Sequence, residues 1–198
     1  MLIEWVLVSV GALLAVASTI LSQYAISRKN KEIAEIESKI QCCTSELDAI
    51  RETETSAKSV LNHYEELVGI AKIQFNVRGR ADIDLLATAG EAFLQGMAFR
   101  YSAAKSVARN DPTIETERAK WKAMFEKSIT EGDASEITDA RDKLLLEYLD
   151  RNNRLVKDIG QFRIQKKMFE QRAESYNSWN LGFLVLGIII ALAKDLFT

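Results

Sequence analysis

The segment Lys31–Ile50 reads KEIAEIESKIQCCTSELDAI, and its apolar residues recur at spacings of three and four. The same spacing continues from Ile33 to Phe75, where Glu54 is the single charged residue on the apolar face. No proline interrupts this stretch, and its first glycine is Gly69. A heptad pattern of this length predicts one long helix with a buried seam. The segment must therefore pack along another helix.

A second segment with the same spacing is the best candidate partner. The apolar residues from Leu145 to Tyr176 also recur at threes and fours, which predicts a long helix that begins near Ser135. We expect the two long helices to pair as an antiparallel coiled-coil hairpin, in which the numbers of facing residues sum to about 205. Pairing of the first helix with a second copy of itself is the alternative.

Two shorter helices are predicted between the long ones. Asp82 is a suitable N-cap for a helix that ends near Arg109. Asp111 and Pro112 open the next helix, and Gly132 ends it. These two helices are expected to flank the far part of the hairpin.

Both ends of the chain are apolar. The 23 residues from Trp5 to Ser27 carry no charge, which is long enough to cross a hydrocarbon layer of about 30 Å. A cleaved signal peptide is the alternative, but the preceding residues include Glu4 and no basic residue. The 19 residues from Ser175 to Ala193 are also uncharged, and Lys194 follows them. The sequence therefore predicts a transmembrane helix at each end.

Basic residues flank the inner ends of both predicted spans: Arg28, Lys29, Lys31, Lys166, Lys167 and Arg172. The positive-inside rule then places the middle section in the cytoplasm and both termini outside. The predicted fold is an all-α membrane protein, with spans at 1–27 and 179–198 that continue into a cytoplasmic helical domain at 28–178.

Three groups of residues are candidate sites within this fold. Small residues in the two spans are predicted to allow close helix packing: Gly11, Ala15, Ser18, Ser22, Gly187 and Ala191. The predicted register places Glu54 opposite Arg151 and beside Asn152, so that polar residues in the two seams satisfy each other. Apolar residues of the alanine-rich helix are expected either in the core or at a subunit interface: Leu86, Phe93, Leu94 and Met97.

No motif in the sequence indicates a reaction. Cys43 and Cys42 take neighbouring d and c positions, and His63 takes an exposed c position, so packing and solvent exposure explain them. The net charge of −2 gives no reason to expect nucleic acid. We therefore predict a non-enzymatic protein without cofactor or metal, which acts as an oligomeric scaffold or adaptor for a cytosolic partner. The alternative is a ring-forming channel or a membrane-permeabilising effector, in which Ser18 and Ser22 line a polar path.

Overall fold

The computed structural model describes the backbone of residues 2–193 and the side chains of residues 5–190, 192 and 193. These residues form four continuous helices and no strand. The first comprises α1 (Leu2–Ile20), the π-helical stretch η1 (Leu21–Ile26) and α2 (Ser27–Arg78). The others are α3 (Ile83–Lys105), α4 (Pro112–Glu131) and α5 (Ser135–Ala193). The all-α prediction is confirmed, whereas the π-helical stretch was not anticipated.

The ends of the shorter helices follow from local chemistry. The Asp82 and Asp111 side chains accept hydrogen bonds from backbone amides in the first turns of α3 and α4, at 3.0 and 2.8 Å. Gly132 ends α4 in the left-handed conformation, with φ of 71°. The helix α3 ends at Lys105, four residues before the predicted Arg109, because Ser106 turns into the left-handed region at φ of 55°.

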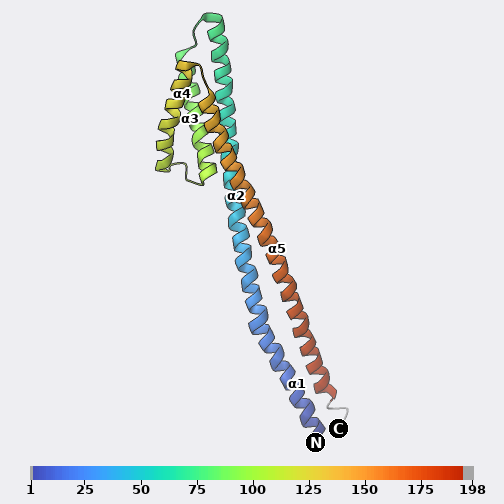
Figure 1. Ribbon diagram of the computed structural model, residues 1–198. Helices are drawn as coiled ribbons and strands as arrows, with labels where there is room; N and C mark the ends of the chain where they lie inside the picture. Colours follow the sequence, from blue (N-terminus) through green and yellow to red (C-terminus); the bar gives the residue numbers. More distant parts are fainter. Residues whose placement is uncertain (1, 194–198) are drawn as a thin grey trace. The chain divides into compact units, whose positions relative to one another are not determined.

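The chain forms two compact units, and α2 and α5 contribute residues to both. The helix-pair unit consists of Met1–Cys42 and Asp158–Thr198, and the four-helix unit consists of Cys43–Lys157. Figure 1 shows α3 and α4 side by side within the four-helix unit.

The four-helix unit has an aromatic core. The Phe93 ring on α3 is fully buried, and its centroid lies 5.3 Å from that of Tyr64 on α2 and 5.8 Å from that of Phe125 on α4. Trp121 of α4 and Leu144 of α5 belong to the same buried cluster. Burial raises the pKa of the Tyr64 hydroxyl. The seam predicted for α2 is therefore the buried face of this unit.

Two glycines let α3 approach its neighbours closely. A Cβ atom at Gly96 would lie 2.6 Å from Cγ of Leu61 on α2, and one at Gly90 would lie 2.8 Å from Cε1 of Phe125 on α4. Neither position has room for a side chain without movement of the neighbour. Glycine at these two sites thus fixes the distances from α3 to α2 and α4.

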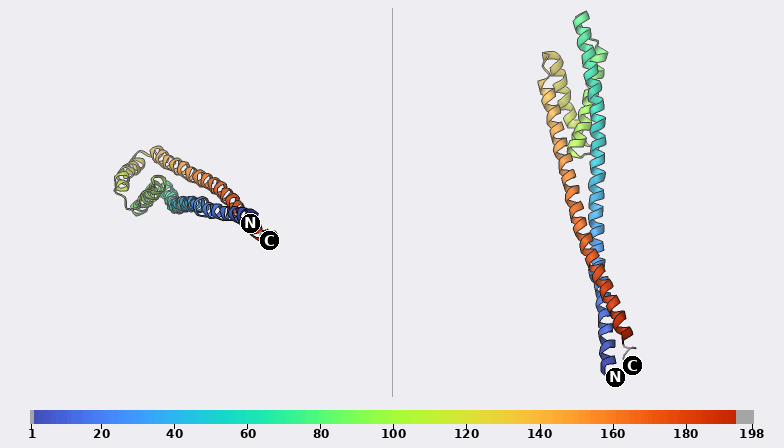
Figure 2. Two further views of the ribbon diagram at one scale, coloured as in Figure 1. Left: turned by 90° about the horizontal axis from the view of Figure 1, so that it is seen from below. Right: turned by 90° about the vertical axis from the view of Figure 1, so that its right-hand side faces the viewer.

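In the helix-pair unit, the N-terminal helix and the end of α5 run antiparallel, as Figure 2 shows. A Cβ atom at Gly11 would lie 3.4 Å from the Gly187 carbonyl oxygen, so the two backbones are close. The Ser18 hydroxyl donates a 2.6 Å hydrogen bond to the Asn180 amide oxygen. Nearer the other end of the unit, Lys166 forms a 2.6 Å ion pair with Glu37.

The predicted register holds within one helical turn at one contact in each unit. In the four-helix unit, the Arg51 side chain contacts Asn152 at 3.0 Å, where Arg154 was the predicted neighbour. In the helix-pair unit, Lys166 pairs with Glu37, for which Met168 was the predicted neighbour. In the same unit, however, Gly11 lies against Gly187 and not against position 194, an offset of about two turns. The prediction placed Ser27 level with Ser178, since their numbers also sum to 205. The contact between Ser18 and Asn180 sets a different alignment, because an amide in an apolar stretch needs a hydrogen-bond partner.

One helical stretch within residues 2–193 is long and apolar enough to cross a membrane, and it begins at Trp5 in α1. Almost none of this stretch is buried in the structure, whereas the core helix of a soluble protein is mostly buried. The predicted second span, the two-span hairpin and the external termini remain predictions. Lys194, which follows the predicted second span, lies outside the described residues.

Candidate functional site

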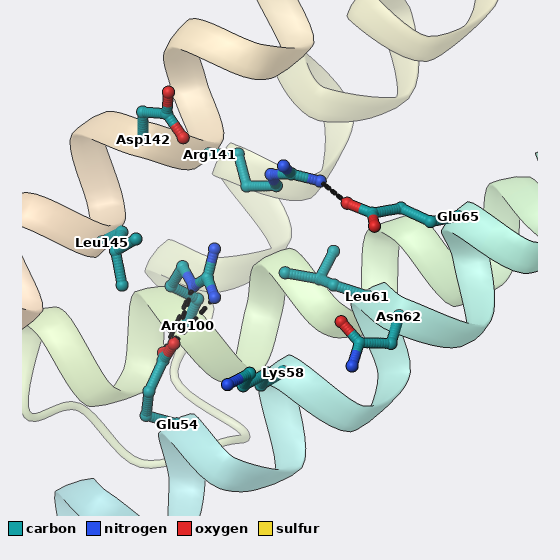
Figure 3. Close-up of a pocket in the computed structure, with 9 residues that line it drawn as sticks. All are labelled: Glu54, Lys58, Leu61, Asn62, Glu65, Arg100, Arg141, Asp142 and Leu145. Atoms are coloured by element: carbon teal, nitrogen blue, oxygen red, sulfur yellow. Dashed lines mark hydrogen bonds and ion pairs between the residues drawn. The ribbon is translucent and has the colours of Figure 1, made fainter.

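A polar pocket of about 380 Å³ lies within the four-helix unit. Residues of α2, α3 and α5 line it, as Figure 3 shows: Glu54, Lys58, Leu61, Asn62, Glu65, Arg100, Arg141, Asp142 and Leu145. Three carboxylates and three cations are therefore gathered around one cavity. Of these six charged residues, only Glu54 and Arg100 are buried.

Glu54 and Arg100 form a two-pronged ion pair inside the protein. The Arg100 Nη2 atom donates to Glu54 Oε1 at 2.7 Å, and Arg100 Nε lies 3.2 Å from both carboxylate oxygens. The Glu54 side chain is only 11% exposed and the Arg100 side chain only 8%. Gly96 lies one helical turn before Arg100, so the close approach of α3 to α2 brings the guanidinium to the carboxylate. These charge-assisted hydrogen bonds offset the free-energy cost of removing both charged groups from water.

The predicted partner of Glu54 was wrong. Arg151 instead forms an ion pair with Glu46, and Asn152 accepts a hydrogen bond from Arg51. Both contacts still join α2 to α5, but Glu54 itself pairs with α3. The predicted hairpin paired only α2 with α5, whereas the partner of Glu54 lies on a third helix, α3.

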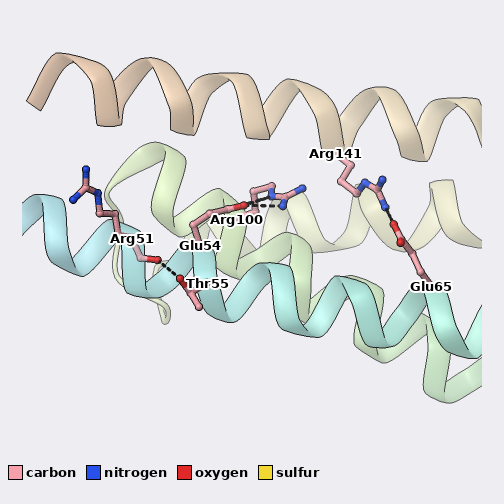
Figure 4. Close-up of polar contacts among 6 residues, drawn as sticks. All are labelled: Arg51, Glu54, Thr55, Glu65, Arg100 and Arg141. Atoms are coloured by element: carbon pink, nitrogen blue, oxygen red, sulfur yellow. Dashed lines mark hydrogen bonds and ion pairs between the residues drawn. The ribbon is translucent and has the colours of Figure 1, made fainter. Parts of the chain in front are cut away.

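A second ion pair closes the other side of the pocket. The Arg141 guanidinium of α5 donates to Glu65 of α2, and both side chains are partly exposed. Figure 4 shows this pair beside the Glu54–Arg100 pair and the helical hydrogen bond from the Thr55 hydroxyl to the Arg51 carbonyl oxygen. The two pairs tie α2 to α3 and to α5. The pocket is therefore a junction of three helices.

No histidine, cysteine or serine lines the pocket, and its three carboxylates balance its three cations. His63 lies on the α2 surface, 3.6 Å from Glu66. Within residues 2–193, no cluster of histidine, cysteine and carboxylate side chains could hold a metal ion. The arrangement thus explains helix docking, and the non-enzymatic reading remains a prediction.

The small residues of the two apolar helices take different positions. Gly11 and Ser18 are buried against α5, whereas Ala15 and Ser22 are exposed. Gly187 faces Gly11. The side chain of Ala191 lies outside the described residues. The predicted stripe of small residues therefore contacts the other helix through only part of its length.

The four residues proposed for a core or an interface belong mainly to the core. Phe93, Leu94 and Met97 are buried within one chain, and Leu86 is half-buried. Neighbouring helices of the same chain cover Phe93, Leu94 and Met97, as the core alternative expects. A subunit interface formed by this helix stays a prediction.

Sequence reasoning missed Arg100 and Asn180, which are the polar partners of Glu54 and Ser18. A signal for Arg100 was available, because it continues the three-four spacing of the buried residues Phe93 and Met97. A charge at such a position needs a counter-charge.

Comparisons with models of protein families, with characterised proteins and with solved structures find no match for this chain.

Proposed function

We propose that the protein is a non-enzymatic, membrane-anchored scaffold whose four-helix unit presents binding surfaces to cytosolic proteins. The observation that carries this proposal is the exposed apolar surface of α1, since almost none of its apolar stretch is buried. Apolar surface on this scale marks contact with a membrane or with other proteins. Homo-oligomerisation is part of the proposal, because the bilayer would hold several copies in one plane.

The polar groups of α1 support a lipid environment. The hydroxyls of Ser9 and Thr19 donate to the carbonyl oxygens one turn earlier, at 2.8 and 2.9 Å. Ser18 donates to Asn180. Polar groups in hydrocarbon must be satisfied within the protein, and these three are. Trp5 and Tyr24, near the ends of the apolar stretch, are exposed as residues of an interfacial aromatic belt would be.

The proposed topology has two spans. The end of α5 also exposes large apolar residues: Leu181, Leu184, Val185, Leu186, Ile188, Ile189 and Leu192. Lys29 and Lys31 follow the first apolar stretch, and Lys167 and Arg172 precede the second. We propose that these basic residues lie at the cytoplasmic surface, with both termini outside.

This topology predicts the accessibility of cysteines in intact cells. A membrane-impermeant maleimide is expected to label a cysteine added before Met1 or after Thr198, in a chain without Cys43, and to leave Cys42 unlabelled. Cys42 is exposed in the structure, so the bilayer alone would protect it. Permeabilised cells give the matched control, in which Cys42 should react. Labelling of Cys42 in intact cells would reverse the orientation.

The alternative function is a pore, and it makes a different prediction. Ser18, one of its two candidate lining residues, is 5% exposed and hydrogen-bonded to Asn180, which supports the packing role. Induced expression is therefore expected to leave membrane potential and dye retention unchanged.

The scaffold proposal makes its own prediction, because the cysteine-free chain should purify as an oligomer in mild detergent. Depolarisation on expression would favour the pore, and a strictly monomeric protein would count against the scaffold.

A further inference from the structure

The four-helix unit has a second cavity, of about 570 Å³, where α4 and α5 meet the end of α3. We call it the α4–α5 groove and define it by the residues that line it: Tyr101, Lys105, Glu117, Trp121, Met124, Glu136, Asp139, Ala140, Lys143, Leu144 and Glu147. From Glu136 to Glu147 it follows α5 for about 16 Å, or three turns. A groove of this length suits an extended ligand better than a compact one.

The floor of the groove is apolar and aromatic. Trp121 and Leu144 are buried beneath it, and Met124 and Ala140 are half-buried. The Tyr101 ring meets the Trp121 ring edge to face, with centroids 5.8 Å apart. An aromatic floor of this kind offers contact area to one or two apolar side chains.

The rim of the groove is acidic. Four of its lining residues are carboxylates and two are lysines, so the lining carries two net negative charges. Glu147 forms a 2.8 Å ion pair with Lys105, which raises the pKa of that lysine through the hydrogen bond. Glu136 pairs with Lys127, and Glu117 pairs with Lys120, both at 2.5 Å. Neither of these lysines lines the groove.

The rim carboxylates are available to a cationic partner. The Glu136–Lys127 pair is about half exposed on both sides, and an exposed pair is worth at most about 1 kcal/mol. Asp139 is exposed and takes part in none of the ion pairs between described residues. A basic ligand could therefore replace or join the present partners at small cost. Anionic ligands such as nucleic acid would meet repulsion.

We propose that the α4–α5 groove binds a basic amphipathic segment of a partner protein, with an apolar side chain on Trp121 and lysines or arginines against Glu136 and Asp139. The partner should be basic because its charges would complement the acidic rim. It should be amphipathic because the floor of the groove is apolar. This inference deepens the proposed scaffold function and rests on it for its biological meaning.

The test uses the full chain in nanodiscs of phosphatidylcholine, whose neutral surface does not attract basic peptides. The probe is a fluorescein-labelled helical peptide of about 14 residues made of leucine and lysine at amphipathic spacing, roughly three turns or more in length. We expect saturable binding by fluorescence anisotropy, above that of empty nanodiscs. The same peptide with glutamate in place of lysine is expected not to bind.

Charge reversal in the groove decides the outcome. The double variant E136K/D139K is expected to weaken binding about tenfold or more, because two attractive rim charges become repulsive. The matched control E52K/E126K makes the same change in net charge at exposed carboxylates outside the groove, and its affinity should stay within about twofold of the wild type. Circular dichroism checks that both variants are folded.

Equal losses in the two variants, or no binding of the basic peptide, would overturn the groove as a docking site. Neither result would bear on whether the protein is anchored in a membrane, because resistance to carbonate extraction measures anchoring separately. Conversely, a protein that carbonate releases from membranes would fail as an anchored scaffold even if its groove binds the peptide. The two failures are thus distinguishable.

Discussion

Replacing Glu54 with leucine is expected to lower the free energy of unfolding of the four-helix unit by about 3–5 kcal/mol. The change leaves the Arg100 guanidinium, which is 8% exposed, without its carboxylate partner. A buried charge without a partner costs far more than the net value of the pair that is lost. Urea unfolding in mild detergent measures the effect through Trp121 fluorescence, in a background with phenylalanine at positions 5 and 179.

A double variant separates loss of the pair from burial of the unpaired charge. E54L/R100M removes both charges and fills similar volume, so we expect it to regain most of the stability lost in E54L. E65L is the matched control, because its partner Arg141 is partly exposed, and a loss of less than about 1 kcal/mol is expected. If E54L and E65L had equal, small effects, the Glu54–Arg100 pair would not be a buried determinant of helix docking.

Phe93→Ala is expected to destabilise the same unit by about 3–5 kcal/mol. The ring is fully buried, and its neighbours Tyr64 and Phe125 would border the cavity left behind. These neighbours belong to α2 and α4, so the cavity would weaken the contacts of α3 on both sides. The same urea titration, followed through Trp121, measures the loss.

Phe75→Ala provides the comparison for Phe93. Phe75 continues the heptad pattern of α2, but it is 60% exposed near the end of the helix. We expect a change within about 0.5 kcal/mol at this position. A loss at Phe75 as large as that at Phe93 would show that the core of the unit extends to the end of α2.

Much of the fold could be predicted from local signals in the sequence. The heptad positions from Leu47 to Ala71 do form the buried face of α2, because burial of an apolar stripe is what stabilises such a helix. Asp82 and Asp111 begin helices because their carboxylates satisfy free backbone amides. At Phe75 the pattern fails, since α2 continues past the residues that cover it.

The contacts between helices were harder to predict. The choice between Arg100 and Arg151 as the partner of Glu54 depends on how closely α3 approaches α2, which glycine at position 96 allows. Similarly, the alignment of the apolar helices depends on the contact between Ser18 and Asn180. Both are long-range pairings, which periodicity along one helix does not encode.

We propose that the apolar helix from Trp5 onward anchors the protein in a bilayer. Alkaline carbonate extraction of membranes from cells that express the full chain tests it most directly, because carbonate releases peripheral proteins and leaves integral ones. We expect the protein to stay in the membrane pellet, together with an integral marker protein. Recovery of the protein in the carbonate supernatant, with the marker still in the pellet, would show that this helix does not anchor it.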